Sequence, residues 1–131
     1  HLGKPTLLVT LNIKKMGNMP CNPSIGGSAK GIVVREIDAL GGVMGIAADH
    51  EYLQIKFLNT SKGPGVQSLR TQEDKITYPA HIQSIALNTP NLTVIEEHVI
   101  ALIHDDNHVF GVKTEEGNTF LSKAVMVSQS L

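Results

Sequence analysis

The sequence has one cysteine, no tryptophan and no apolar run long enough to cross a membrane. A single cysteine excludes an internal disulfide framework and fits a reducing compartment. A membrane-spanning helix needs roughly 20 consecutive apolar residues, and no secretory signal pattern is present. We therefore expect a cytoplasmic protein that makes no use of a membrane.

An excess of charge of one sign is also missing. Lys and Arg total 11, Asp and Glu total 12, and aromatic residues make up 4% of the 131 residues. The chain as a whole therefore lacks the basic character of many nucleic-acid-binding proteins, and it has few rings on which bases could stack. A local basic patch remains compatible with this composition. The length is that of one modest domain.

Clustered metal ligands are absent from the sequence as well. The six histidines include no pair at metal-binding spacing on a predicted helix, and none has a cysteine partner. The segment Asp105-Asp106-Asn107 lacks the ligand spacing of a calcium loop and is typical of a hairpin turn. We expect no metal site.

The sequence does contain alternating strand and helix patterns. Residues 6–11 form a nearly continuous apolar run and residues 53–57 alternate, so both are predicted strands. Apolar residues three and four apart predict a helix over residues 26–40. We expect Ser24 to be its N-cap and Gly41-Gly42 to end it in a left-handed turn.

A polar loop at residues 59–65 precedes a second predicted helix at about residues 68–87, which Pro79 should kink or divide. The order of elements predicts an α/β fold, taken as one domain over residues 1–131, with an antiparallel β-meander inserted at about 93–122. The remaining predicted strands are residues 93–95, 99–103, 109–114, 119–121 and 124–127.

The lone thiol, Cys21, lies in a loop between Pro20 and Asn22-Pro23. Proline restricts the backbone, so this loop would hold the sulfur with little entropy left to lose. A helix N-terminus at Gly26-Gly27, and Lys30 within that helix, would favour the nucleophilic thiolate. The alternative is a structural cysteine, since free cysteine is among the most buried residue types.

Three motifs resemble one family closely. They are Cys-Asn-Pro-Ser-Ile-Gly-Gly at residues 21–27, Asp-Ala-Leu-Gly-Gly at 38–42 and Leu-Asn-Thr-Ser-Lys-Gly-Pro at 58–64. With Arg70 and Gln72, they make nearly the whole chain similar to part of the longer GidA/MnmG family protein. The resemblance implies a partial FAD/NAD(P)-binding Rossmann-like fold. The first strand and the G-x-G-x-x-G turn of such folds are missing from the sequence.

The resemblance implies the flavoprotein subunit of an FAD-dependent tRNA-modifying enzyme, which acts as a homodimer with an MnmE-type GTPase. It would add a carboxymethylaminomethyl group to C5 of the wobble uridine of tRNA. The implied cofactors are FAD, NADH and, as one-carbon donor, methylene-tetrahydrofolate. The chain alone is expected to be inactive and to hold no FAD, because the pyrophosphate turn is missing.

Two alternatives remain at this point. One is a relative, the folate-dependent tRNA uridine methyltransferase, against which the Asn-Pro-Ser-Ile-Gly-Gly loop argues because that relative has a different cysteine loop. The other is a non-catalytic nucleotide-binding or interaction module, which the missing pyrophosphate turn favours for the isolated chain.

The resemblance also suggests roles for particular residues. Cys21 is the candidate catalytic residue, through addition of its thiol to the pyrimidine ring. Paired glycines at 26 and 27 would let a ligand approach the backbone closely. Residue 12 follows the first predicted strand, where dinucleotide-binding folds hold the adenosine ribose. The candidate FAD contacts are Asn12, Asn22, Gly26, Gly27 and Val99.

Three basic residues are candidate contacts for tRNA phosphates, namely Lys30, Lys62 and Arg70. Most surface lysines and arginines are simply solvated, which is the alternative for each of them. Lys62 is the strongest candidate because Pro64 stiffens its loop and packing gives little reason for a basic residue there.

Overall fold

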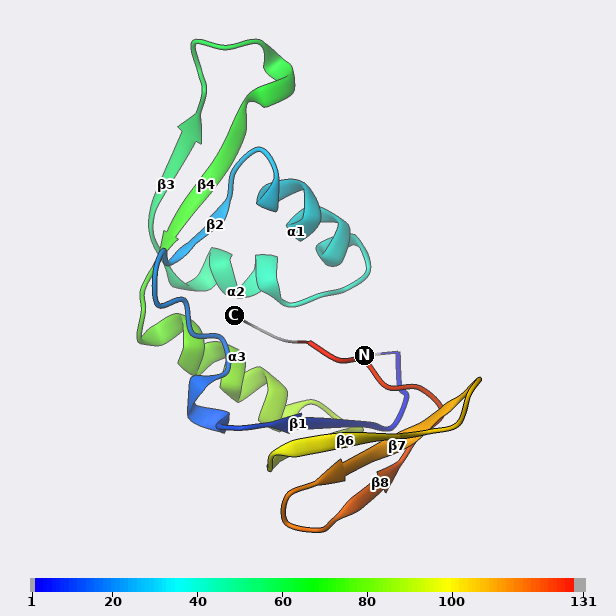
Figure 1. The fold of residues 1–131 in the computed structure, drawn as a ribbon. Helices are drawn as coiled ribbons and strands as arrows, with labels where there is room; N and C mark the ends of the chain where they lie inside the picture. Colours follow the sequence, from blue (N-terminus) through cyan, green and yellow to red (C-terminus); the bar gives the residue numbers. More distant parts are fainter. Residues whose placement is uncertain (1, 129–131) are drawn as a thin grey trace. The chain divides into compact units, whose positions relative to one another are not determined.

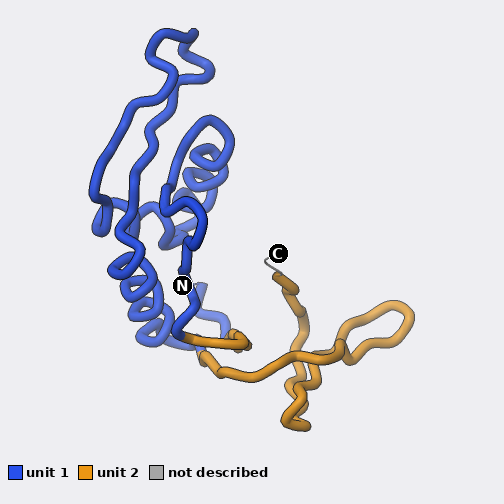
Figure 2. The backbone as a smooth tube through the Cα atoms, turned by 60° about the vertical axis from the view of Figure 1, so that its left-hand side comes forward, with its two compact units in different colours: residues 1–5, 14–92 blue, residues 6–13, 93–131 orange. Residues whose placement is uncertain are grey.

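The computed structural model describes residues 2–128 and contains two compact units. Residues 1–5 and 14–92 form the first unit, and residues 6–13 and 93–131 form the second (Figure 2). No helix within the described range is long and apolar enough to span a membrane.

The first unit is built on a three-stranded antiparallel sheet (Figure 1). Its strands β2 (Ser24–Gly26), β3 (Tyr52–Leu58) and β4 (Ser68–Glu73) lie in the order β2-β4-β3, so β4 is central. The β3–β4 hairpin closes through a polar loop and a short 3-10 helix, η2 (Pro64–Val66). The predicted strand and loop in this hairpin are confirmed.

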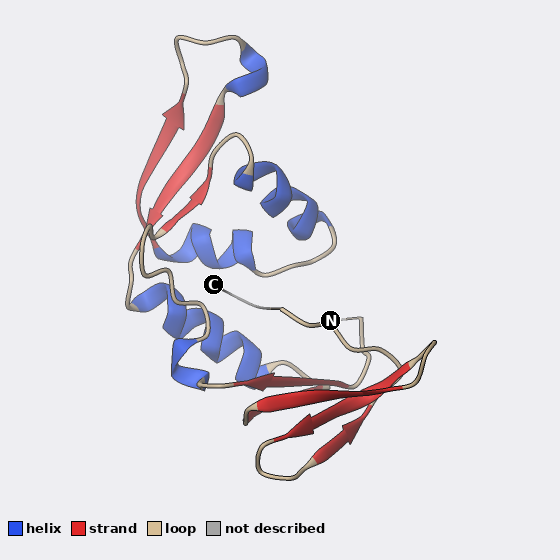
Figure 3. Cartoon of the chain, in the orientation of Figure 1, coloured by secondary structure: helices blue, strands red, loops and turns tan. Residues whose placement is uncertain are grey.

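Three helices accompany this sheet: α1 (Lys30–Ala39), α2 (Met44–Glu51) and α3 (Thr77–Asn88) (Figure 3). Both α1 and α2 contact β4, and α3 packs on α2. The hydrophobic core of the unit lies where these elements meet. It consists of Ile25, Val34, Ala47, Ala48 and Tyr78.

The end of α1 agrees with the prediction. The N–H of Gly42 donates to the Ile37 carbonyl and the N–H of Gly41 to the Asp38 carbonyl, both at 2.8 Å. Gly41 has a φ of 84°, and these two bonds define a Schellman motif. An added Cβ on Gly42 would lie 2.1 Å from the Ile37 side chain, so a larger residue does not fit there.

The start of α1 differs from the prediction. Ser24 is not an N-cap, because it is buried within β2 and the helix begins six residues later, at Lys30. The residue at the N-cap, Ala29, makes no side-chain hydrogen bond. Gly26 and Gly27 have φ values of 116° and 92°, which lie outside the right-handed helical region, so the helix cannot include them.

The predicted helix at residues 68–87 is wrong in its first part, which forms β4. A strand with partners on both sides satisfies its backbone groups as fully as a helix would. The helix begins late because Asp74 Oδ1 accepts the N–H groups of Ile76 (2.7 Å) and Thr77 (2.8 Å). Pro79 lies in the first turn, where its missing N–H breaks no helical bond, so α3 is a single helix.

In the second unit, β1 (Thr6–Thr10) pairs with β5 (Leu92–Glu96) in a two-stranded sheet. The N–H of Glu97 donates to the Thr10 carbonyl at 3.0 Å. The carboxyl ends of the two strands therefore meet, which is the parallel arrangement. Both strands were predicted and are confirmed.

The rest of the second unit is an antiparallel meander of β6 (Val99–His104), β7 (Val109–Thr114) and β8 (Thr119–Leu121), in that order. The predicted meander is confirmed, as is the α/β class. The predicted strand at residues 124–127 is wrong, because that segment pairs with no strand within residues 2–128.

Between η1 (Ile13–Lys15), a single 3-10 turn, and β2 runs the loop that carries Cys21. Gly17 in this loop has a φ of 77°, and an added Cβ would lie 3.1 Å from Ile82 and 3.2 Å from Pro79. The loop therefore packs closely against α3.

Candidate functional site

Cys21 is exposed, on a loop that several hydrogen bonds hold in place. The side-chain amide of Gln83, on α3, donates to the carbonyls of Lys14 (3.0 Å) and Met16 (3.1 Å). Lys75 Nζ donates to the carbonyl of Pro20, the residue before Cys21, at 3.2 Å. The prediction of a constrained loop thus has its physical basis in α3 as well as in the prolines.

The cysteine loop leads into a strand and not, as the sequence suggested, directly into a helix. Strand β2 lies between Cys21 and α1, so the first turn of α1 is separated from the cysteine loop in the chain by a bonded strand. Lys75 bonds to the backbone of the loop directly before Cys21. The sequence analysis missed Lys75 because only the fold brings it to the cysteine loop.

Asn22 connects the cysteine loop to the central strand. Its Oδ1 accepts hydrogen bonds from Arg70 Nη2 and from Ser24 Oγ, both at 3.1 Å. Lys30 Nζ donates to the carbonyl of Ser24 at 2.9 Å. Cys21, Asn22, Lys30 and Arg70 are therefore assembled around the start of β2.

Gly26 and Gly27 have different structural surroundings. An added Cβ on Gly26 would lie 2.3 Å from the Leu69 carbonyl oxygen, so only glycine allows β2 to approach β4 this closely. The N–H of Gly27 donates to the same carbonyl at 2.9 Å. That amide is therefore not available to a ligand, whereas the space beside the Gly27 Cα is open, with no atom within 4 Å of an added Cβ.

The buried carboxyl group of Glu73 lies at the end of β4, the strand that pairs with β2. Glu73 is 1% exposed, and its Oε2 has no hydrogen-bond partner among the described residues. Its backbone N–H donates to the Pro23 carbonyl at 2.7 Å, and its Oε1 is hydrogen-bonded to the Thr71 hydroxyl. Burial raises the pKa of Glu73, and the carboxylates of Asp49 and Glu51 raise it further. The sequence analysis missed Glu73 because it fell inside a predicted helix.

A polar cavity of about 320 Å³ opens on the β3–β4 hairpin. It contains two cationic side chains, of which only Arg70 was a candidate from the sequence. Lys56, the other, was missed because it occurred as one polar residue in an alternating strand. The lining residues are Gln54, Lys56, Leu58, Arg70 and Gln72.

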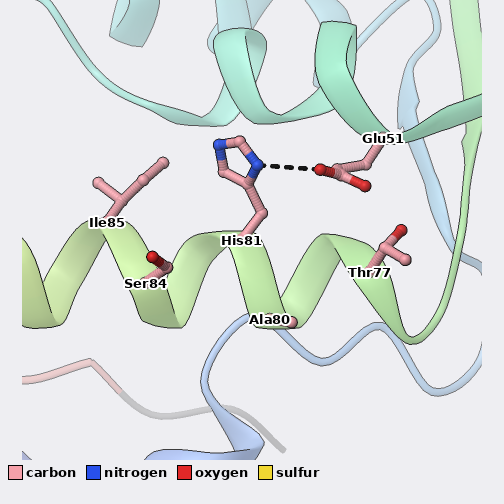
Figure 4. A pocket seen from close by; sticks show the side chains of 6 residues that line it. All are labelled: Glu51, Thr77, Ala80, His81, Ser84 and Ile85. Carbon is pink, nitrogen blue, oxygen red and sulfur yellow. Dashed lines mark hydrogen bonds and ion pairs between the residues drawn. The ribbon is translucent and has the colours of Figure 1, made fainter.

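A second cavity, of about 410 Å³, lies between α2 and α3 (Figure 4). His81 Nδ1 is 2.9 Å from Glu51 Oε1, and the His50 ring stacks on the His81 ring at 5.3 Å. Hydrogen bonds from Thr77 and from His81 lower the pKa of Glu51. The remaining lining residues, Ala80, Ser84 and Ile85, supply little further polar chemistry.

The other site residues predicted from the sequence lie elsewhere. Lys62 is on the loop that closes the β3–β4 hairpin, at the opposite end of that hairpin from the cysteine loop. Asn12 and Val99 belong to the second unit. Val99, 36% exposed, begins β6, an edge strand of the meander, and Asn12 precedes Ile13, whose N–H donates to Glu96 Oε2 at 2.8 Å.

Within residues 2–128, no group of three or more His, Cys, Asp or Glu side chains is placed to hold a metal ion.

A comparison with protein families decides how this arrangement is classified. The family model described as "Glucose inhibited division protein A" matches residues 1–129. The chain belongs to the GidA family. The resemblance noted from the three motifs is therefore confirmed.

GidA relatives are similar over nearly the whole chain. The chain is 51% identical over 123 residues to the "tRNA uridine 5-carboxymethylaminomethyl modification enzyme MnmG" of Acholeplasma laidlawii, covering 94% of this chain and 20% of that protein. It is 51% identical over 130 residues to the protein of the same name from Lactococcus lactis, covering 98% and 21%. The chain thus spans about one fifth of the length of these relatives.

The fold also matches a solved GidA. The structure of Aquifex aeolicus GidA aligns with a TM-score of 0.85 in one crystal form and 0.86 in another, each at 48% sequence identity. Each alignment covers 92% of this chain and 20% of the Aquifex chain. At this identity the match supports both the fold and the family.

Proposed function

We propose that this chain is part of the flavoprotein subunit that adds a carboxymethylaminomethyl group to C5 of the wobble uridine of tRNA. The curated relatives that carry this activity in their names are 51% identical to it. The observation that carries the proposal is the exposed Cys21, on a loop that hydrogen bonds of Asn22, Lys75 and Gln83 hold in place. A purely structural cysteine would be expected among packed apolar side chains.

The proposed role of Cys21 is nucleophilic. Its thiolate adds to C6 of the uracil ring, forming an S–C6 bond, and the electron pair of the C5–C6 double bond moves to C5 as an enolate. C5 then attacks the methylene carbon of the iminium that glycine forms with the one-carbon unit of methylene-tetrahydrofolate, whose remainder leaves as tetrahydrofolate. Loss of the C5 proton and of the Cys21 thiolate, as the S–C6 bond breaks, restores the C5–C6 double bond. The loop contributes by holding the sulfur in one place, which lowers the entropic cost of attack.

The residues present fit part of an FAD site. The open side of Gly27 and the exposed Asn22 would border the flavin. For Asn12 and Val99, a contact with the adenosine end is proposed from the family resemblance alone. FAD, when bound, would supply the oxidation–reduction chemistry. Gly26 acts indirectly, since its close approach to β4 leaves no room for a ligand on that side.

The proposal includes the partners and substrates of the whole enzyme. These are tRNA, a GTPase of the MnmE type, NADH, methylene-tetrahydrofolate and a second copy of the subunit. For tRNA, Arg70 and Lys62 present cationic groups, and Lys30 retains N–H donors beyond the one that it gives to Ser24.

Replacement of the thiol tests this function. In the full-length gene product that contains this sequence, Cys21→Ala should retain bound flavin and lose wobble-uridine modification by about 10³-fold or more, as expected for removal of a nucleophile. Flavin absorbance and nucleoside analysis of digested tRNA measure the two properties. Unaltered modification by Cys21→Ala would show that the thiol has no chemical role.

A further inference from the structure

One face of the three-stranded sheet places two cations side by side. In the β3–β4 ladder, Lys56 is directly opposite Arg70, and Gln54 is directly opposite Gln72. Residues paired in this way point to the same face of a sheet, and alternate residues along a strand share that face. All four side chains therefore border the cavity of about 320 Å³ on the hairpin.

The face that carries Lys56 and Arg70 is not the face that packs on the hydrophobic core. Ile25, the residue of β2 that enters the hydrophobic core, is paired with Thr71 of β4, which in turn is opposite Ile55 of β3. That row alternates with the cationic row, so it faces the other side of the sheet, towards α1 and α2. Packing of the unit therefore gives no reason for cations at positions 56 and 70.

The charges on this face are not neutralised. Like charges directly opposite each other on neighbouring strands destabilise a sheet, and the cavity lining contains no acidic residue. The ion pairs shown within residues 2–128 all involve histidines, and Arg70 is bonded to a neutral amide, that of Asn22. A bound anion would remove the repulsion between Lys56 and Arg70, which makes the face complementary to negative charge.

The cationic face continues into the cysteine loop. Gly26 of β2 is opposite Arg70, which is opposite Lys56, so these three residues form one row across the sheet. Arg70 also bonds to Asn22, the residue after Cys21. An anion held here would therefore lie beside the proposed reaction site.

We propose that Lys56 and Arg70, flanked by Gln54 and Gln72, bind a phosphodiester group of the tRNA substrate close to the modified base. The inference rests on the proposed function and deepens it by naming where the RNA backbone is held. A guanidinium binds a phosphate through a planar fork of donors, an ammonium acts as a point charge, and carboxamides add neutral N–H donors. This combination suits single-stranded RNA, whose bases can be splayed away from the backbone.

The test is the salt dependence of RNA binding. In the full-length gene product, Lys56→Gln should weaken binding of the anticodon stem–loop and reduce the slope of log affinity against log salt by about 0.7 to 0.9, the value for one phosphate contact. Lys56→Arg, which keeps the charge, should preserve the slope. Lys113→Gln, an exposed strand lysine of the second unit, is the matched control and should leave the slope unchanged.

Each other outcome decides against the site. If Lys56→Gln keeps the wild-type slope of log affinity against log salt, the phosphate contact is overturned and the proposed function is left intact. Loss of bound flavin with unchanged RNA binding would assign the cations to a cofactor phosphate instead. Failure of the wild-type protein to bind the stem–loop would overturn the proposed function and, with it, the identity of this ligand. If Lys56→Gln fails to fold, loss of the slope in Lys56→Arg contradicts the proposal.

Discussion

At the scale of single residues, Glu73 is a buried carboxyl group whose pKa its surroundings raise. The Thr71 hydroxyl lies within hydrogen-bonding distance of both Glu73 Oε1 and the Ile25 carbonyl, at 3.1 Å from the latter. A hydroxyl has one proton, and a carbonyl can only accept. The hydroxyl proton of Thr71 is therefore shared between the two oxygens, and Thr71 links the buried carboxyl group to β2.

On balance, the surroundings of Glu73 favour its neutral form. Burial is the largest cause of its raised pKa, the Asp49 and Glu51 carboxylates add to the rise, and the Thr71 hydroxyl and Lys30 oppose it. A raised pKa in the folded state means that the stability contributed by this group is fully present below its ordinary pKa of 4.5 and is lost as pH rises through the raised value.

Glu73→Gln should therefore stabilise the full-length protein at pH 8 by about 1 kcal/mol or more, because the glutamine oxygen can accept from Thr71 without burying a charge. The difference should shrink towards pH 4. Thermal melting across pH measures the effect, and hydrogen exchange of the β2 amides localises it. A Glu73→Gln protein that is less stable than wild type at pH 8 would show that the fold stabilises the ionised carboxylate, which contradicts a raised pKa.

Residues of this kind could not be found from the sequence. The motif around Cys21 predicted a constrained loop, because prolines and turn residues act locally, but it left open whether the thiol is buried; in the structure it is exposed. The surroundings of Glu73 and Lys75 depend on how β4 and the segment that follows it meet β2 and the cysteine loop. Those of Lys56 depend on Arg70, its partner on the neighbouring strand. Such pairings join residues distant in sequence, which local patterns do not encode.

At the scale of elements, hydrogen bonds to the Glu51 carboxylate connect α2 and α3 near the surface. Thr77 and His81 of α3 both bond to the Glu51 carboxylate at the end of α2 and lower its pKa. The stability from this group is present above its ordinary pKa of 4.5 and is lost as pH falls through the lowered value.

Glu51→Gln should lower the melting temperature of the full-length protein at pH 7, by less than a core substitution would, because the pair is near the surface. Towards pH 3 the two melting temperatures should converge, since the wild-type carboxyl becomes protonated as pH falls through its lowered pKa. Glu36→Gln, on α1, is the control and should change little at either pH. A difference that persists unchanged at pH 3 would exclude the carboxylate as its cause.

Elements also show where sequence patterns succeed and fail. The glycine pair at 41–42 ends α1 as predicted, because a left-handed turn is a local requirement. The segment 68–73 was predicted to be helical, but it pairs on both sides and forms the central strand. Cross-strand hydrogen bonding therefore overrode the local pattern, and Asp74 set the true start of the helix.

At the scale of the whole molecule, the two units differ in how they are stabilised. The buried hydrophobic residues of the described range all lie in the first unit. The second unit consists of two small sheets, whose buried residues include Gly111 and Thr114. Small sheets without an apolar core are marginally stable, so the experiments above use the full-length gene product.

The thiol loop belongs to the first unit, and two of the predicted FAD contacts, Asn12 and Val99, belong to the second. The central claim of the proposed activity concerns a single bond, between Cys21 and the wobble uridine.

The most direct measurement is covalent trapping with a tRNA that carries 5-fluorouridine at the wobble position. Fluorine at C5 cannot leave as a proton does, so the S–C6 bond should persist through denaturation. We predict an adduct that peptide mass spectrometry maps to Cys21 in the full-length protein and that is absent from Cys21→Ala. An adduct that maps to another residue, or no adduct under conditions where wild-type tRNA is modified, would contradict the account.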